Sequence, residues 1–205
     1  ENLMIPVLRQ IRSKFKASYK NVAYLEKSDR IVFILNFDDI HKGFDLDYIE
    51  NLMHSLAESN LFKEFYYCVS ISSKVEKLGI PKANKEVLGT QKVLRLFHNP
   101  NKILSYEELG IYKLFLESNS LDELGKFISP RINKFRLDYP DLFETLKVFL
   151  DTNQSHILTS EKLFLHPKTV RYRIDKIKCI LGTDFENPEE ILQIQIASRL
   201  FNLME

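Results

Sequence analysis

Residues 159–177 read TSEKLFLHPKTVRYRIDKI, a pattern that predicts two short helices joined by a tight turn. Pro167 suits the first position of the second helix, because its missing N–H would have no partner there and its φ is already helical. Leu165 precedes the expected cap at His166 and would pack against Val170 one turn into the helix, forming a hydrophobic staple. The start of the second helix is therefore specified by its own residues.

The second helix is predicted to have one packed face and one open face. At roughly 100° per residue, its apolar side chains fall on a single stripe formed by Val170, Ile174, Ile177 and Leu181. The opposite face and the flanks collect polar and basic residues, namely Lys168, Thr169, Arg171, Tyr172, Arg173, Asp175 and Lys176. One face is expected to join a core, and the other stays available for a ligand.

Basic charge is concentrated on this segment. Between Ser155 and Lys178 there are six Lys or Arg residues against Glu161 and Asp175, a net charge of +4, whereas the whole chain carries +1. A local basic patch on a near-neutral chain favours phosphate contacts made by one element. The alternative is an amphipathic helix whose basic face is merely solvated. The turn chemistry favours a helix-turn-helix that places its second helix in the major groove of DNA.

A further helix is predicted near the end of the sequence. Asn187 suits the cap, Pro188 suits the first helical position, and Glu189 and Glu190 complement the positive end of a helix that runs to about Met204. This helix is apolar on nearly every side, which indicates burial on several sides. It fits the centre of a domain core better than a dimer contact, although a dimer contact would suit a protein that reads two half-sites.

Several motifs occur in the order and spacing of a known family. They are Glu144-Thr145-Leu146 with Phe149-Leu150, then Leu163-Phe164-Leu165-His166, then Thr169-Val170-Arg171-Tyr172-Arg173-Ile174, and last Asn187-Pro188-Glu189 before an apolar run. From about Asp141 to Leu200 the sequence resembles the C-terminal helix-turn-helix domain of the PucR/CdaR family of bacterial transcription regulators. One departure is Ser160, where the family usually has alanine on the buried side of the first motif helix. Serine fits there if its hydroxyl bonds back to the preceding turn.

The resemblance implies that the partner is double-stranded operator DNA, with the second motif helix in the major groove. The candidate DNA-binding residues are Lys168, Thr169, Arg171, Tyr172, Arg173 and Lys176. Arginine is the usual two-bond partner of guanine, whereas Lys, Thr and Tyr more often hold phosphates. Arg173 lies near the packed stripe, so pairing of its guanidinium with Asp175 or a neighbouring helix is as well supported as a DNA contact.

The first part of the chain predicts a separate α+β domain. Two apolar runs, Val22–Leu25 and Ile31–Phe37, flank a polar turn and predict a β-hairpin. The elements expected next are a helix at Asp45–Glu58, a strand at Phe65–Ile71, a helix at Lys82–Phe97 and an extended piece at Lys102–Tyr106. This order predicts an antiparallel-rich sheet covered by helices. The expected domains are residues 1–117, a helical linker at 118–140 with a helix at Leu121–Ile128, and an all-α helix-turn-helix domain at 141–205.

The order of these elements is similar to the degenerate GGDEF-like domain that precedes the helix-turn-helix in the same family. YLEKSDRIVFIL (24–35) lies where a cyclase carries its GGDEF hairpin, and ILSYEELGIYKLF (103–115) resembles the end of that domain. The turn Lys27-Ser28-Asp29-Arg30 has no glycine pair to admit a guanine nucleotide and no acidic pair to hold the metals of phosphoryl transfer. We therefore expect a non-catalytic scaffold for sensing or dimerisation, with no catalytic residues and no cofactor.

Signals for metal, disulfide and membrane chemistry are weak. Asp38-Asp39, with Asp45 and Asp47 nearby, could hold Mg²⁺, but loop carboxylates and helix caps explain these residues better. The histidines show no ligand spacing and Cys68 and Cys179 stand alone, so neither a zinc site nor a disulfide is expected. No apolar run approaches the roughly 18 residues of a membrane span, and unpaired cysteines suit a reducing cytosol, so a cytoplasmic protein is expected.

The leading hypothesis is a sequence-specific transcription regulator, which the resemblance associates with a metabolic operon of the purine or sugar-acid type. A homodimer is expected, and a small-molecule effector would bind a sensory domain absent from this chain, which begins with Glu1 rather than methionine. Two alternatives stay open. One is a nucleotide-handling enzyme of the GGDEF fold, and the other is a protein-interaction module whose basic helix meets an acidic partner.

Overall fold

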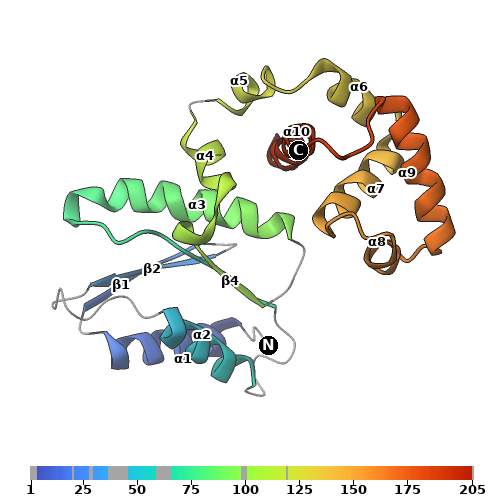
Figure 1. The fold of residues 1–205 in the computed structure, drawn as a ribbon. Helices are drawn as coiled ribbons and strands as arrows, with labels where there is room; N and C mark the ends of the chain where they lie inside the picture. Colours follow the sequence, from blue (N-terminus) through green and yellow to red (C-terminus); the bar gives the residue numbers. More distant parts are fainter. Residues whose placement is uncertain are drawn as a thin grey trace. The chain divides into compact units, whose positions relative to one another are not determined.

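A computed structural model describes residues 4–19, 21–27, 30–36, 46–58, 66–97, 101–118 and 120–204. The chain divides into two compact units, one formed by residues 1–94 and 98–106 and the other by residues 95–97 and 107–205. Each unit has a hydrophobic core of its own. The described residues are mostly helical, with short strands in the first unit (Figure 1).

The described strands of the first unit form two separate pairs. The elements up to residue 105 are α1 (Met4–Ser18), β1 (Asn21–Glu26), β2 (Ile31–Asn36), α2 (Leu46–Ala57), β3 (Cys68–Ile71), the 3₁₀ helix η1 (Lys77–Gly79), α3 (Ile80–Leu96) and β4 (Lys102–Ser105). β1 and β2 are antiparallel, with Asn21 opposite Asn36 and Glu26 opposite Ile31, so the predicted hairpin is confirmed. β3 and β4 are parallel, because α3 connects them as a crossover.

The single sheet expected from the sequence is wrong for the described residues, in which no hydrogen-bonded ladder joins the two strand pairs. Both pairs nevertheless contribute to one core, because α1 and α2 lie on the same side of the strands (Figure 1). The buried centre of this core consists of Val7, Phe15, Ile49, Leu52, Met53 and Leu56. Half-buried strand residues pack against it, including Val22, Phe33, Val69 and Ile103.

α1 was not predicted, although its sequence carried a usable signal. Val7, Ile11 and Phe15 recur every four residues, which places them on one helix face, and all three pack in the core of the first unit. The other predicted elements are found with shifted ends. Asp38, Asp39 and Asp45, which were weighed as magnesium ligands and better explained as loop and cap residues, lie outside the described residues. Phe37 and Phe65, at the ends of two predicted strands, also lie outside them.

The second unit is built from helices. Its elements are the 3₁₀ helix η2 (Tyr106–Glu108, which begins at the last residue of the first unit), α4 (Ile111–Glu117), α5 (Leu121–Gly125), α6 (Pro130–Asp138), α7 (Pro140–Asp151), α8 (His156–Leu163), α9 (Pro167–Leu181) and α10 (Pro188–Met204). Its core gathers side chains of α6, α7, α9 and α10. α6 lies in the segment expected to be a linker, yet its Ile132 and Phe135 are buried in this core.

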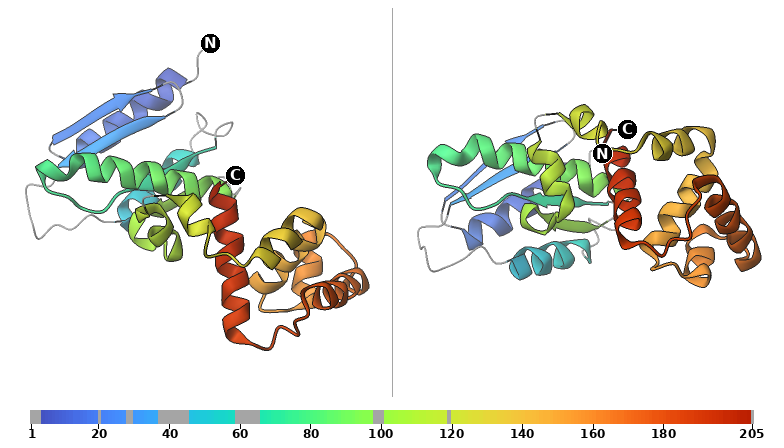
Figure 2. Two further views of the ribbon diagram at one scale, coloured as in Figure 1. Left: turned by 90° about the horizontal axis from the view of Figure 1, so that it is seen from above. Right: turned by 45° about the horizontal axis from the view of Figure 1, so that its top comes forward.

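α10 is confirmed as a core helix, and Figure 2 shows it in red as the long helix that ends at the C-terminus. Ile194, Ala197 and Phe201 are at most 5% exposed and belong to the core of the second unit. The guanidinium of Arg136 on α6 lies 4.3 Å from the centre of the Phe201 ring on α10, so a cation–π contact joins the two helices. Part of the apolar surface that predicted burial is therefore buried within the unit, while Leu192 and Met204 are 47% and 43% exposed.

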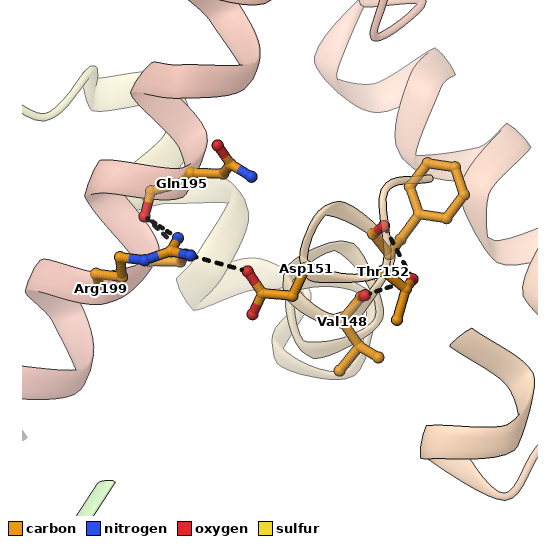
Figure 3. Close-up of polar contacts among 7 residues, drawn as sticks. Val148, Asp151, Thr152, Gln195 and Arg199 are labelled. Carbon is orange, nitrogen blue, oxygen red and sulfur yellow. Dashed lines mark hydrogen bonds and ion pairs between the residues drawn. The ribbon is translucent and has the colours of Figure 1, made fainter. Parts of the chain in front are cut away.

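A polar contact also joins α10 to the end of α7 (Figure 3). Arg199 donates from Nη2 to Asp151 Oδ1 over 3.1 Å and from Nη1 to the Gln195 carbonyl over 3.1 Å. Both side chains of the ion pair are partly exposed, so it contributes at most about 1 kcal/mol. Burial raises the pKa of Tyr112 on α4, and the Asp151 carboxylate adds to this rise while Arg199 opposes it. The ion pair links α10 to the last residue of α7, from which the chain turns into α8.

Two absences hold within the described part of the chain. No helix there combines the length and the apolar character needed to cross a membrane. Across the same residues, no group of three or more His, Cys, Asp or Glu side chains is placed to hold a metal ion. Cys68 and Cys179 are both exposed free thiols.

Candidate DNA-binding surface

The recognition helix α9 begins as its sequence predicts. His166 is the N-cap, and its Nδ1 accepts a hydrogen bond from the Lys168 backbone N–H over 3.2 Å. Pro167 occupies the first turn, and Leu165 packs against the core that contains Val170, its predicted partner in a hydrophobic staple. The local chemistry of the turn therefore sets the direction in which α9 leaves it.

The two faces of α9 are also confirmed. Val170, Ile174, Ile177 and Leu181 are the buried residues of the helix, at 0–2% exposure. The candidate DNA-binding residues that are exposed are Lys168, Thr169, Arg171, Tyr172 and Lys176. Tyr172 is 67% exposed and lies near the centre of the open face. The helix thus presents mainly donors and cations to solvent, with Asp175 as the exposed acidic residue among them.

Arg173 differs from the other candidates, because its guanidinium already has a partner inside the unit. Arg173 is half-buried, and its Nη1 donates to Thr145 Oγ1 on α7 over 3.0 Å. Thr145 is fully buried, and its hydroxyl donates in turn to the Asp141 carbonyl over 2.9 Å. The sequence had left a structural role and a DNA contact equally open for Arg173. The contact with Thr145 supplies the structural role, with α7 rather than Asp175 as the partner.

Replacing Thr145 with valine is expected to lower the free energy of unfolding by about 1–2 kcal/mol, because the half-buried Arg173 loses an acceptor while the side-chain shape is kept. A double-mutant cycle with Arg173→Met in chemical denaturation measures the contact itself. We expect a coupling energy of about 1 kcal/mol between the two changes. Purely additive effects would show that Arg173 is not anchored to α7.

α8, the first helix of the motif, packs through small polar side chains. Thr159 and Ser160 are 0% and 4% exposed. Thr159 Oγ1 lies 2.7 Å from Thr152 Oγ1 at the end of α7 and donates to the Ser155 carbonyl over 2.6 Å. Ser160 Oγ donates to the Ile157 carbonyl over 2.7 Å, which confirms that serine is accommodated by bonding back to the preceding turn. Small hydroxyl-bearing residues therefore let α8 lie close to α7 without an apolar stripe.

The turn between α8 and α9 is a Schellman motif. The N–H groups of Phe164 and Leu165 donate to the carbonyls of Glu161 and Ser160 over 3.3 and 2.9 Å. Phe164 has φ 52° and ψ 40°, a left-handed conformation that costs a residue with a Cβ roughly 1–2 kcal/mol and is usually filled by glycine or asparagine. The sequence predicted the turn but not that Phe164 adopts this conformation.

Two helices joined by this turn, with the second helix packed on one side and cationic on the other, define a helix-turn-helix DNA-binding domain. Residues 142–200 match the family described as the PucR C-terminal helix-turn-helix domain, and this segment of the chain is such a domain. The match covers α7 to α10 almost completely. It does not extend to the GGDEF-like assignment of the first unit.

Curated relatives match parts of this chain. An uncharacterized protein of Haemophilus influenzae is 31% identical over 106 residues, which are 51% of this chain and 29% of that protein. The purine catabolism regulatory protein of Bacillus subtilis is 28% identical over 87 residues, or 41% of this chain and 16% of that protein. An uncharacterized protein of Mycobacterium bovis is 36% identical over 64 residues, or 31% of this chain and 16% of that protein.

The aligned region is therefore less than a third of the length of each of these relatives. No solved structure is a significant match to the chain. The comparisons thus establish the class of the C-terminal domain.

Proposed function

We propose that this protein is a transcription regulator of the PucR/CdaR type that reads operator DNA with the exposed face of α9. The observation that carries the proposal is the division of α9 into a fully buried stripe and an exposed basic face within a PucR-type domain. The name of the Bacillus subtilis relative supports a metabolic operon of the purine type, and sugar-acid use is the other role that the family resemblance suggests. Such a regulator works in the cytoplasm, where its DNA is.

The proposed contacts differ in kind along the open face. Arg171 is exposed one turn from the start of α9, where side chains of a recognition helix meet base edges, and we assign it to base reading. Lys168 lies at the N-terminus of α9 and is assigned to a phosphate, as are Thr169, Tyr172 and Lys176. Arg173, held by Thr145, orients α9 on α7 and stays a weaker candidate for direct contact.

The first unit is proposed to be a non-catalytic, GGDEF-like scaffold for a homodimer. Helix-turn-helix proteins commonly read two half-sites as dimers. The hairpin face opposite the core supports self-association, because its Leu25 and Ile34 are 56% and 44% exposed, while Val22 and Phe33 on the other face pack in the core. A small-molecule effector would then bind a part of the protein outside this chain.

Selection of duplexes from a random-sequence DNA pool by the full chain tests the proposal. The affinity for a recovered duplex and for a scrambled duplex is then measured at about 50 and 200 mM salt, since phosphate contacts alone weaken steeply over this range. We expect one enriched motif whose preference survives at the higher salt, with half-sites about 10–10.5 base pairs apart. Failure to enrich any motif, with equal and salt-sensitive binding to all duplexes, would refute a sequence-reading regulator.

A further inference from the structure

The ring of Phe164 has no place in the core of the second unit. Phe164 is 95% exposed, whereas Phe143 and Phe149 of α7 and Phe201 of α10 are 2–6% exposed. Its neighbour Leu165 packs against the core, so the turn itself is anchored and the ring points away from it. Exposure of this ring therefore results from the geometry of the turn and not from a loose segment.

The backbone at Phe164 makes this exposure more informative. The residue is left-handed with φ 52°, and the Schellman hydrogen bonds to Glu161 and Ser160 hold it there. Glycine or asparagine would suit the same position better. A bulky residue that neither fills the core nor suits its backbone conformation contributes little to the stability of the described fold. Such outliers are a physical reason to look for function.

The position of Phe164 on the motif points to a partner. It stands three residues before Pro167, so the two Cα atoms are at most about 11 Å apart, while the major groove is about 12 Å wide. In a helix-turn-helix the second helix enters this groove with its N-terminal residues at the bases, and the first helix crosses the DNA backbone. Docked in this way, the turn between α8 and α9 would lie at the edge of the groove, with Phe164 four residues before the exposed Lys168.

We propose that Phe164 is a specificity-determining residue whose ring contacts a thymine C5-methyl group at the edge of the major groove. The inference rests on the proposed DNA-reading role of α9. The ring offers no hydrogen-bonding group, so it cannot read the polar edges of bases. The apolar group that the major groove presents is the thymine methyl, and phenylalanine is one of the side chains that contact it.

The test uses the full chain and a duplex recovered by selection with the wild-type protein. Binding of wild-type, Phe164→Gly and Phe164→Asn chains is measured on this duplex and on versions in which each thymine in turn is replaced by deoxyuridine, which lacks the methyl group. Phe164→Asn removes the ring but retains a residue that accepts the left-handed conformation. Asn153→Gly is the matched control, because Asn153 is also exposed with φ 52°, in the turn that precedes α8.

Both Phe164 variants are expected to bind the thymine duplex about three- to fivefold more weakly, the amount that one buried methyl group contributes. At one thymine position, deoxyuridine should weaken the wild type by the same factor and leave both variants unchanged. Phe164→Gly should unfold at the same or higher denaturant concentration, and Asn153→Gly should bind DNA as the wild type does.

Each other outcome is decisive. If both Phe164 variants bind the duplex with wild-type affinity, the ring does not contact DNA. Equal losses on thymine and deoxyuridine duplexes at every position would overturn the methyl contact. Failure of the wild-type chain to select any duplex would refute the proposed function before the role of Phe164 is measured, so the two failures are distinguishable.

Discussion

Replacing Ile174 with alanine is expected to lower the free energy of opening of α9 by about 2–5 kcal/mol. Ile174 is 1% exposed and belongs to the same core as Leu146 of α7 and Ile194 of α10, which are 0% and 2% exposed. Removal of its branched side chain leaves a cavity in the core shared by α7, α9 and α10, because the surrounding side chains relax only partly. Amide hydrogen exchange of peptides that cover residues 167–181 measures the effect directly.

Tyr172→Ala is the matched control for this change. Tyr172 lies two residues from Ile174 on the same helix but is 67% exposed, so its truncation should alter the opening free energy by no more than about 0.5 kcal/mol. The same variant removes a proposed DNA contact and therefore should affect binding more than stability. Comparable protection in the wild type and in Ile174→Ala would mean that α9 does not pack through the stripe seen here.

The faces of α9 could be predicted because their causes are local. The start of α9 depends on the cap at His166 and the proline after it, and both are found as predicted. Its buried face depends on the spacing of Val170, Ile174 and Ile177, which is also found as predicted. The contact between Arg173 and Thr145 spans 28 residues and depends on how two helices pack, which no local pattern specifies. The sequence therefore indicated the two possible roles of Arg173 but could not choose between them.

Other features were missed because they break the usual patterns. α8 buries Thr159 and Ser160 rather than apolar residues, so hydrophobic periodicity does not identify its packed face. The left-handed Phe164 stands where sequence statistics favour glycine or asparagine. In the first unit the hairpin could be predicted, because its two strands are joined by a short polar turn. The pairing of β3 with β4 could not, because these strands are far apart in the sequence and are connected by a crossover through α3.

The open face of α9 leads to a second large expected effect, on DNA binding. Arg171→Ala is expected to weaken binding to the selected duplex by about 1–3 kcal/mol, roughly a 5- to 150-fold loss, and to relax the preference at one base pair. The reason is that a guanidinium holds two acceptors of guanine at once. Arg171→Lys keeps the charge but not the two-pronged geometry, so it should recover non-specific affinity without recovering the base preference.

Lys168→Ala separates charge from base reading on the same helix. If Lys168 holds a phosphate, its loss should weaken binding to all duplexes alike and reduce the slope of log affinity against log salt by about 1. Lys134→Ala, an exposed lysine on α6 outside the α8–α9 segment, is the control for a loss of one positive charge. Affinities are measured for selected and scrambled duplexes at several salt concentrations. Unchanged binding by both Arg171→Ala and Lys168→Ala would show that this face of α9 is not the DNA-reading surface.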